Sequence, residues 1–530
     1  MTLKNTMVPI PNKRITYKKA SNGTVYVYYT LRAYRNNDGK PTSDEAAIGK
    51  IDSATGNLIP NRRYYEIFQC SEPIVPIEIS PNGVKNCGTV ATLMEITKQT
   101  GLLEILKKCF SSEWDKILAC AFYILCESNV MMYIEDWFDE TKIQFTERMD
   151  DMACSKLFAS ITEVERARFF REWVLERGDK EYIAYDVSSI STHSSGIDIA
   201  EWGYNRDGER LPQVNIGMYY GVTSHMPVYY NLYNGSIPDK SYLEFMMIGA
   251  KDLGIRDVCF VMDRGFVTED NFICMSENHF SFITALPGNR LDAMKLIDDN
   301  KGSIRKVSNR IGEYEVYGTR IPFEVYGLNL YAHIYFDPEK QAFDEKELYA
   351  RIDKLQEGLE KMSHTKRATK KYSDYFMIDE GQKGALTFEL DTEKVDEKLG
   401  RAGFFILLSS KPGLSSGEVL KIYRERDVIE KNFEQFKNRL DFKRMRTHWN
   451  KTTEGKMFVG FIALILRSYM LRMIKRDTQI KHLTFNKVLI ELRKIKMVTL
   501  TDLSEILTPL TKLQRTILSI LGVPTEALRM

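Results

Sequence analysis

Residues 423–437 read Tyr-Arg-Glu-Arg-Asp-Val-Ile-Glu-Lys-Asn-Phe-Glu-Gln-Phe-Lys, and this stretch decides the fold and the function that we predict. Wound as an α-helix, it brings four polar side chains within about 60° of one another: Tyr423, Arg426, Glu430 and Lys437. An adjoining apolar stripe needs a core to pack on: Ile422, Ile429, Phe433, Phe436 and Leu440. A carboxylate beside cations is ordinarily a surface ion pair. A tyrosine, an arginine, a glutamate and a lysine on one face beside a buried stripe instead indicate a site for an anion.

Two aspartates extend this predicted site. Tyr182–Ser188 is typical of a short strand with Asp186 near its end, and a nearly continuous apolar run from residue 257 ends at Asp263. Such a run indicates a strand buried on both faces. In open α/β sheets, sites gather at strand ends. Two aspartates and a helical glutamate supply the oxygen ligands that Mg²⁺ or Mn²⁺ prefers.

The helical pattern by itself leaves the choice of glutamate open. Asp427 and Glu434 share the helical face of Glu430, so geometry does not rank these three carboxylates. His193 and His225 lack the spacing of a metal site with His or Cys ligands.

These residues together resemble the DDE transposases of bacterial insertion sequences. The resemblance is to the group marked by Tyr-x2-Arg-x3-Glu-x6-Lys, which Tyr423, Arg426, Glu430 and Lys437 match at every spacing. Asp263-Arg264-Gly265-Phe266 resembles that group's second aspartate motif, and Asp186 occupies the place of the first. The similarity covers about residues 181–475, and it selects Glu430 from the three carboxylates.

The resemblance implies an α/β fold with a ribonuclease-H-like core, a mixed five-stranded sheet flanked by helices. The sequence pattern agrees, because three strands, a helix, a strand, a helix and a strand follow one another from residue 182 to 286. The distance from Asp263 to Glu430 is too long for an unstructured connection, which predicts a β-rich and helical insertion. Within the insertion, Leu348, Ile352, Leu355, Leu359 and Met362 have coiled-coil-like spacing.

We therefore divide the chain into six parts. These are a β-rich N-terminal region (1–80) with a possible DNA contact, a helical region (81–180) for recognition of DNA ends, the first part of the core (181–286), the insertion (287–402), the second part of the core with the catalytic helix (403–480), and C-terminal helices (481–530) for packing or dimerisation. The last part includes predicted amphipathic helices over Leu483–Lys494, Leu500–Leu507 and Lys512–Leu521.

Composition restricts how this chain binds nucleic acid. Its formal net charge of +2 is nearly neutral, so DNA contacts must come from local basic patches. Besides the signature residues, we predict DNA contacts for Arg264, Arg444, Arg446, Trp449, Lys370 and Lys371. Trp449 is suited either to stacking on a base or to a place in the core.

Other features indicate a cytoplasmic protein, and the resemblance implies a bacterial one that is nucleoid-associated when it acts. The eight cysteines contain no CxxC pair, which is typical of free thiols in a reducing compartment. The first 19 residues lack a signal-peptide apolar segment. The uncharged run Met457–Leu466 is too short to span a bilayer and predicts a buried helix behind the catalytic helix.

The function implied by the resemblance is DNA transposition. Asp186, Asp263 and Glu430 would hold two Mg²⁺ or Mn²⁺ ions, for cleavage at the element's ends and transfer of the freed 3′-OH to target DNA. Arg426, Lys437 and Tyr423 would contact phosphates. The expected partners are the terminal inverted repeats, target DNA and a second copy of the chain. The alternatives are an inactive, domesticated DNA-binding relative and a metal-dependent nuclease without strand transfer.

Overall fold

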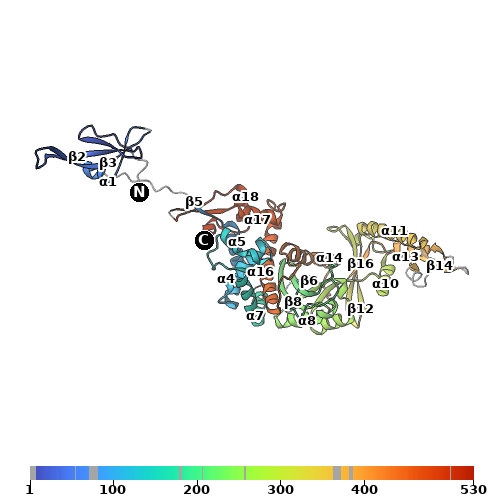
Figure 1. The fold of residues 1–530 in the computed structure, drawn as a ribbon. Helices are drawn as coiled ribbons and strands as arrows, with labels where there is room; N and C mark the ends of the chain where they lie inside the picture. The colour runs from blue at the N-terminus through green and yellow to red at the C-terminus, as the bar shows by residue number, and fades with distance from the viewer. Residues whose placement is uncertain are drawn as a thin grey trace. The chain divides into compact units, whose positions relative to one another are not determined.

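The computed structural model describes residues 7–53, 55–70, 81–177, 182–205, 207–255, 258–361, 372–380, 386–501 and 503–529. The chain forms two compact units (Figure 1). The smaller comprises Met1–Asn82 and Leu500–Ser504, and the larger comprises Gly83–Thr499 and Glu505–Met530.

The smaller unit is an antiparallel sheet with one helix. Its strands lie in the order β1 (Ile15–Lys19), β2 (Val25–Arg35), β3 (Pro41–Ile51) and β4 (Leu58–Pro60), and α1 (Arg62–Phe68) follows. Val27, Ile48 and Leu58 are fully buried and form its core. The first four residues of β3 are exposed, and its buried residues, Ala46, Ile48 and Gly49, lie in the second half of the strand.

The larger unit is organised around a nine-stranded mixed sheet. Its order is β11 (Arg310–Ile311), β12 (Val316–Val325), β13 (Leu328–Phe336), β16 (Phe404–Ser409), β10 (Ser281–Leu286), β9 (Cys259–Met262), β6 (Tyr182–Ser191), β7 (Gln213–Gly221) and β8 (Met226–Asn234). Strand β9 is parallel to both β6 and β10, whereas the other neighbours are antiparallel.

The core of this sheet is consistent with the ribonuclease-H-like expectation. Three strands, α8 (Asp239–Asp252), β9, α9 (Glu269–Glu277) and β10 follow in the predicted order. The five strands predicted for this core are adjacent in the sheet, in the order β10-β9-β6-β7-β8, but the sheet extends beyond them. Strand β16 pairs with β10 and with β13 of the insertion, so the sheet continues through β12 to β11. The pairing satisfies backbone groups that an edge at β10 would leave open.

The insertion adds a small core of its own beyond the sheet. It contains α10 (Leu291–Asn300), η3 (Val307–Asn309), α11 (Pro338–Glu360), the pair β14 (Phe376–Glu380) and β15 (Leu386–Leu390), and α13 (Thr392–Leu399). Ile352 and Leu359 of α11 are buried with Tyr372, Phe376 and Val395. The regular apolar spacing of α11 is therefore used for packing within the chain.

Helices from the N-terminal half surround one long buried helix. They are α2 (Gly88–Gln99), α3 (Leu102–Cys109), α4 (Trp114–Cys126), η1 (Met131–Tyr133), α5 (Ile134–Glu140), α6 (Asp151–Ser160) and α7 (Glu163–Arg177). The long helix α16 (Asn450–Arg476) contacts α4, α6 and β8 (Figure 1). A Cβ at Gly455 would lie 1.9 Å from the Phe158 carbonyl oxygen, so only glycine permits the approach of α6.

Helix α16 is long and apolar enough to cross a membrane, but 78% of its apolar window is buried inside the protein. In the described residues, the only other candidate is α4 combined with η1–α5 across a bend of 105°. Burial of this kind is what the core helix of a folded domain shows, as predicted for Met457–Leu466.

The C-terminal region differs from the prediction in one element. Helices α17 (Phe485–Arg493) and α18 (Lys512–Ile520) form near the predicted positions, and η5 (Thr525–Arg529) follows. The described residues among 500–507 are not helical. Instead, β17 (Lys496–Leu500) pairs antiparallel with β18 (Glu505–Leu507), and β5 (Pro81–Asn86) lies beside β17. Thr499 and Ile506 suit this sheet better than a helix, since branched side chains favour strands.

Candidate active site

The stretch that carries Tyr423, Arg426, Glu430 and Lys437, which we call the signature stretch, forms three consecutive helical segments instead of the single helix predicted. Helix α14 (Ser416–Glu425) is followed by α15 (Asp427–Glu434) and by the π-helical turn η4 (Gln435–Arg439). At the first junction, the Arg426 N–H donates to the Tyr423 carbonyl, and the Ile429 N–H donates to the Arg426 carbonyl. The second junction leads into η4, and π-helical turns of this kind are rare and recur at functional sites.

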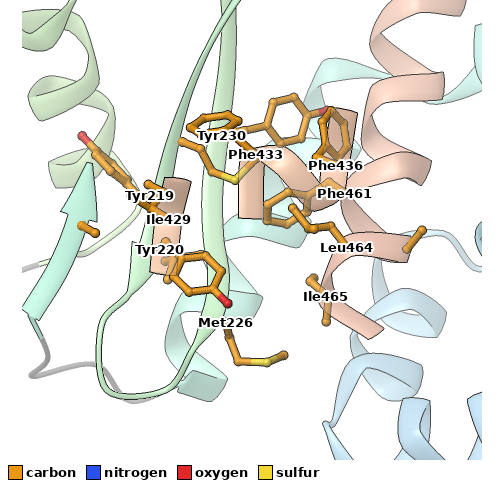
Figure 2. Close-up of a cluster of buried hydrophobic side chains, with 14 of the residues drawn as sticks. Tyr219, Tyr220, Met226, Tyr230, Ile429, Phe433, Phe436, Phe461, Leu464 and Ile465 are labelled. Atoms are coloured by element: carbon orange, nitrogen blue, oxygen red, sulfur yellow. The ribbon is translucent and has the colours of Figure 1, made fainter. Parts of the chain in front are cut away.

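The apolar stripe of this stretch is buried as predicted. Ile429, Phe433 and Phe436 pack between tyrosines of β7 and β8 and residues of α16 (Figure 2). The Phe461 ring of α16 lies 5.2 Å from the Tyr230 ring, and Phe436 stacks on Phe442 at 4.4 Å. A Cβ at Gly460 would lie 2.3 Å from the Phe442 ring, so only glycine at this position leaves room for the ring. The stripe therefore fixes which face of α15 remains available for chemistry.

Asp186 lies in the middle of β6, because that strand continues to Ser191 and does not end near Ser188 as predicted. Its backbone alternation decides where the carboxylate points. A Cβ at Gly217 would touch both the Tyr185 ring and Met246 of α8, so Tyr185 faces α8. Asp186 therefore faces the opposite side, where α15 contacts β6, and it is 7% exposed.

Asp263 follows directly after the last residue of β9. Strand β9 is parallel to β6, with Tyr182 opposite Cys259 and Ala184 opposite Val261. The same offset continued by two residues brings Asp263 opposite Asp186, on strands about 4.8 Å apart. The Asp263 carboxylate accepts a hydrogen bond of 2.7 Å from the Arg264 N–H and caps the turn η2 (Arg264–Phe266).

Glu430 is brought to the same region by α15 and is held there by Arg426. The Arg426 Nη2 donates to Glu430 Oε1 at 2.8 Å. The glutamate side chain is 54% exposed, whereas the arginine side chain is 8% exposed. Arg426 Nε and Nη1 are buried with no hydrogen-bond partner among the described atoms. The arginine is thus a buried cation with donors still to satisfy.

All three carboxylates act electrostatically on Arg426. Burial alone would lower its pKa by opposing the charged form. The pKa is nevertheless raised, because nearby acidic groups outweigh burial: the Tyr423 phenol and the carboxyl groups of Glu430, Asp263 and Asp186. Burial likewise raises the pKa of Tyr423 to about 12, against the opposing effect of Arg426. The guanidinium lies 5.3 Å from the Tyr423 ring centroid.

The donor chemistry of these three carboxylates fits a hard divalent cation. Within the described ranges, however, no three Asp, Glu, His or Cys side chains lie close enough together to ligate one ion. Glu430 pairs with Arg426, and its side chain is 54% exposed. The backbone thus brings the three residues together, while the side chains are arranged around the arginine.

Two acidic residues between β6 and β7, Asp207 and Glu209, pair with the cations that follow Glu430, and we call them the acidic loop. Lys437 Nζ lies 2.7 Å from Asp207 Oδ2, with the lysine side chain 10% exposed. Glu209 accepts a hydrogen bond from Arg444 Nη1 and lies 3.7 Å from Lys443 Nζ. The Arg444 hydrogen bond lowers the pKa of Glu209. Sequence reasoning missed both acids, because nothing local links this loop to η4.

The remaining predicted DNA contacts have different surroundings. Arg264 is exposed in η2 beside Asp263. Arg446 has a positive φ of 50° and pairs with Asp441 at 2.7 Å. Trp449 is 70% exposed, so the alternative of a core residue is wrong. Lys370 and Lys371 lie outside the described residues. Glu434, one turn after Glu430 in α15, lines a cavity that Glu430 does not line, whereas Asp427 is exposed.

We expect the Lys437–Asp207 pair to contribute measurably to stability. Removing one partner leaves the other charge poorly solvated, so the pair's coupling in a double-mutant cycle of Asp207→Asn and Lys437→Gln should be about 1–3 kcal/mol. Chemical denaturation of the four proteins measures it. The exposed pair Lys107–Glu104 is the control and should couple by under about 0.5 kcal/mol. Equal couplings in the two cycles would contradict the observed burial of the pair.

Comparison with known proteins identifies the family of this chain. A search of curated proteins finds no match. Among solved structures, the cryo-EM structure of a piggyBac transposase synaptic complex with hairpin DNA (SNHP) is 9% identical and covers 71% of this chain and 79% of its own. Its TM-score of 0.32 is too low to establish a shared fold. The family described as Transposase DDE domain matches residues 177–466, more than half of the chain. That match spans Asp186, Asp263 and Glu430, and the chain belongs to the DDE transposase family.

Proposed function

We propose that the chain is an insertion-sequence transposase that cleaves DNA at the ends of its element and joins them to target DNA. The observation that carries this proposal is the meeting of two adjacent parallel strands and one packed helix. Asp186, Asp263 and Glu430 come from these three elements and act on one buried arginine. The family match supports the general activity, and the Tyr-x2-Arg-x3-Glu-x6-Lys spacing supports the insertion-sequence group.

In this proposal, Asp186, Asp263 and Glu430 hold two Mg²⁺ or Mn²⁺ ions. Bound divalent cations supply Lewis-acid stabilisation of charge that develops on oxygens at phosphorus. Glu430 must then leave Arg426, which its exposure permits. The released guanidinium has two further buried donors, and its planar fork suits a phosphate. Arg426 therefore changes partner from a carboxylate of the protein to a phosphate of DNA.

We expect Glu430→Gln to reduce cleavage of element-end DNA by about 1000-fold or more, because loss of one anionic ligand removes several kcal/mol of stabilisation. DNA binding should not be lost, because the substitution releases Arg426 for a phosphate, and the protein should remain folded. Gel assays of cleavage and binding measure both. Asp427→Asn, at an exposed position of the same helix, is the matched control and should retain wild-type cleavage. Full activity of Glu430→Gln would end this assignment.

Joining of strands separates a transposase from a nuclease of the same architecture. We expect pre-cleaved element ends with a 3′-OH to become covalently linked to a supercoiled plasmid, since the hydroxyl is the nucleophile of the second displacement. Ends that terminate in a 3′-deoxy nucleotide should bind equally and give no joined product. Cleavage without joining of 3′-OH ends would favour the nuclease, and binding without either reaction would favour an inactive DNA-binding relative.

The acidic loop is proposed to compete with DNA for the cations after Glu430. Asp207 and Glu209 occupy the positions that phosphates would take on Lys437 and Arg444. We expect Asp207→Asn to raise DNA affinity by about two- to tenfold, because DNA no longer has to displace this carboxylate. Fluorescence anisotropy measures the affinity. Asp252→Asn, on the exposed end of α8, removes one negative charge elsewhere and serves as the control. Unchanged affinity in Asp207→Asn would exclude the competition.

We further propose that the active assembly is a homodimer on two element ends, in the bacterial cytoplasm. The family match supports a DNA partner.

A further inference from the structure

A basic cavity lies on a different face of the signature helix from Glu430. Its volume is about 660 Å³. It is lined from four places in the chain, namely the β7–β8 turn, the α15–η4 segment, the end of α16 and the start of α17. None of Tyr423, Arg426 and Glu430 lines it, so the cavity is separate from the carboxylate site.

The cavity concentrates positive charge on a nearly neutral chain. Glu434 is the sole carboxylate among the described residues that line it. Six cations line it: Lys431, Arg439, Arg467, Arg472, Lys475 and Arg476. Lys431, Arg439, Lys475 and Arg476 have no carboxylate oxygen within 4.0 Å in the part of the chain that is described. This arrangement creates a positive potential that a single glutamate does not balance.

Arg467 is a cation of this cavity whose side chain is held in one position by its neighbours. The residue is only 3% exposed. Its Nε and Nη2 donate to Gln435 Oε1 at 3.0 and 2.7 Å, and its guanidinium stacks on the Phe485 ring at 3.8 Å. A neutral amide and an aromatic ring orient this cation but do not neutralise it. Burying a charge without a counter-ion is costly, which points to an anion that arrives from outside.

The electrostatic environment of Arg467 also favours binding of an external anion. Burial, together with the nearby Arg439, lowers the pKa of Arg467 to about 9. The guanidinium therefore stays charged near neutral pH, although its environment disfavours the charge. An incoming anion would relieve both the desolvation and the repulsion.

The walls of the cavity are held by the main core. Tyr220, which lines the cavity, belongs to the buried cluster in Figure 2 together with Phe433 and Leu464. The helices that carry the six cations are thus positioned before any ligand binds, and this lowers the cost of binding.

We propose that this cavity binds the phosphodiester backbone of DNA at a place other than the cleavage site. The proposal rests on the proposed function, because DNA is the polyanion that a transposase already holds. Arginines and lysines from several elements suit successive phosphates, and no base-reading geometry is required. A strand held here would be anchored by the same α15–η4 segment that carries Glu430.

The test is the salt dependence of binding to a fluorescent duplex made from the element's end, without divalent ions. The pocket variant carries Lys431→Gln and Lys475→Gln, and the control carries Lys240→Gln and Lys251→Gln on α8. All four lysines are exposed, so both variants should melt like the wild type. The log–log slope should fall by about 1.8 in the pocket variant, at 0.9 per lost phosphate contact, and stay unchanged in the control.

Equal slopes in the pocket variant and the wild type would overturn the proposal. A second probe, inorganic triphosphate, is measured by thermal shift. Stabilisation by triphosphate that the pocket variant loses, with an unchanged DNA slope, would assign the cavity to a small free polyphosphate and also overturn the DNA assignment. Failure of the wild type to bind element-end DNA would reject the proposed function itself. If the wild type binds and cleaves with dependence on Glu430, equal slopes reject the cavity assignment alone.

Discussion

Packing of the apolar stripe of α15 and η4 is the constraint on which the rest of the structure depends. Ile429, Phe433 and Phe436 are inserted between the β7–β8 tyrosines and α16, and they fix the rotation of the helix about its axis. With that rotation set, Glu430 pairs with Arg426, and Lys431 lines the basic cavity. One hydrophobic interaction thus orients two charged sites that lie on neighbouring faces of the same helix.

The carboxylate site is stabilised without metal by a cation from its own helix. Three acids near one another would repel, and each would resist ionisation. The buried Arg426 compensates for this charge, and the carboxylates in turn keep the arginine protonated despite its burial. The acidic loop plays the corresponding role for Lys437 and Arg444. In both places, protein groups of opposite charge occupy positions where cations or phosphates would bind, so ligand binding becomes an exchange of partners.

The large sheet shows which of its elements could be predicted from the periodicity of apolar residues in short stretches of sequence. Strands β6, β7, β8, β9 and β10 and helices α8 and α9 are each marked by a run of one periodicity, and all form in the predicted order. The nine-stranded width was not predictable in this way, because β16 joins β10 to β13 across more than a hundred residues of sequence. The hairpin at 496–507 was missed for a similar reason. Its strands are short, and their apolar residues fit either periodicity.

The sequence by itself determined the chemistry of the site, because the spacing of Tyr423, Arg426, Glu430 and Lys437 and the two aspartates at apolar strands are local facts. It also determined the buried stripe, since an amphipathic helix has one face to bury. Only the tertiary structure decided the electrostatic partners. Asp207 reaches Lys437 across 230 residues, and Arg467 reaches Gln435 across 32. Such pairs depend on how distant segments pack. The periodicity of side chains along the sequence does not predict which polar groups meet only after the chain has folded.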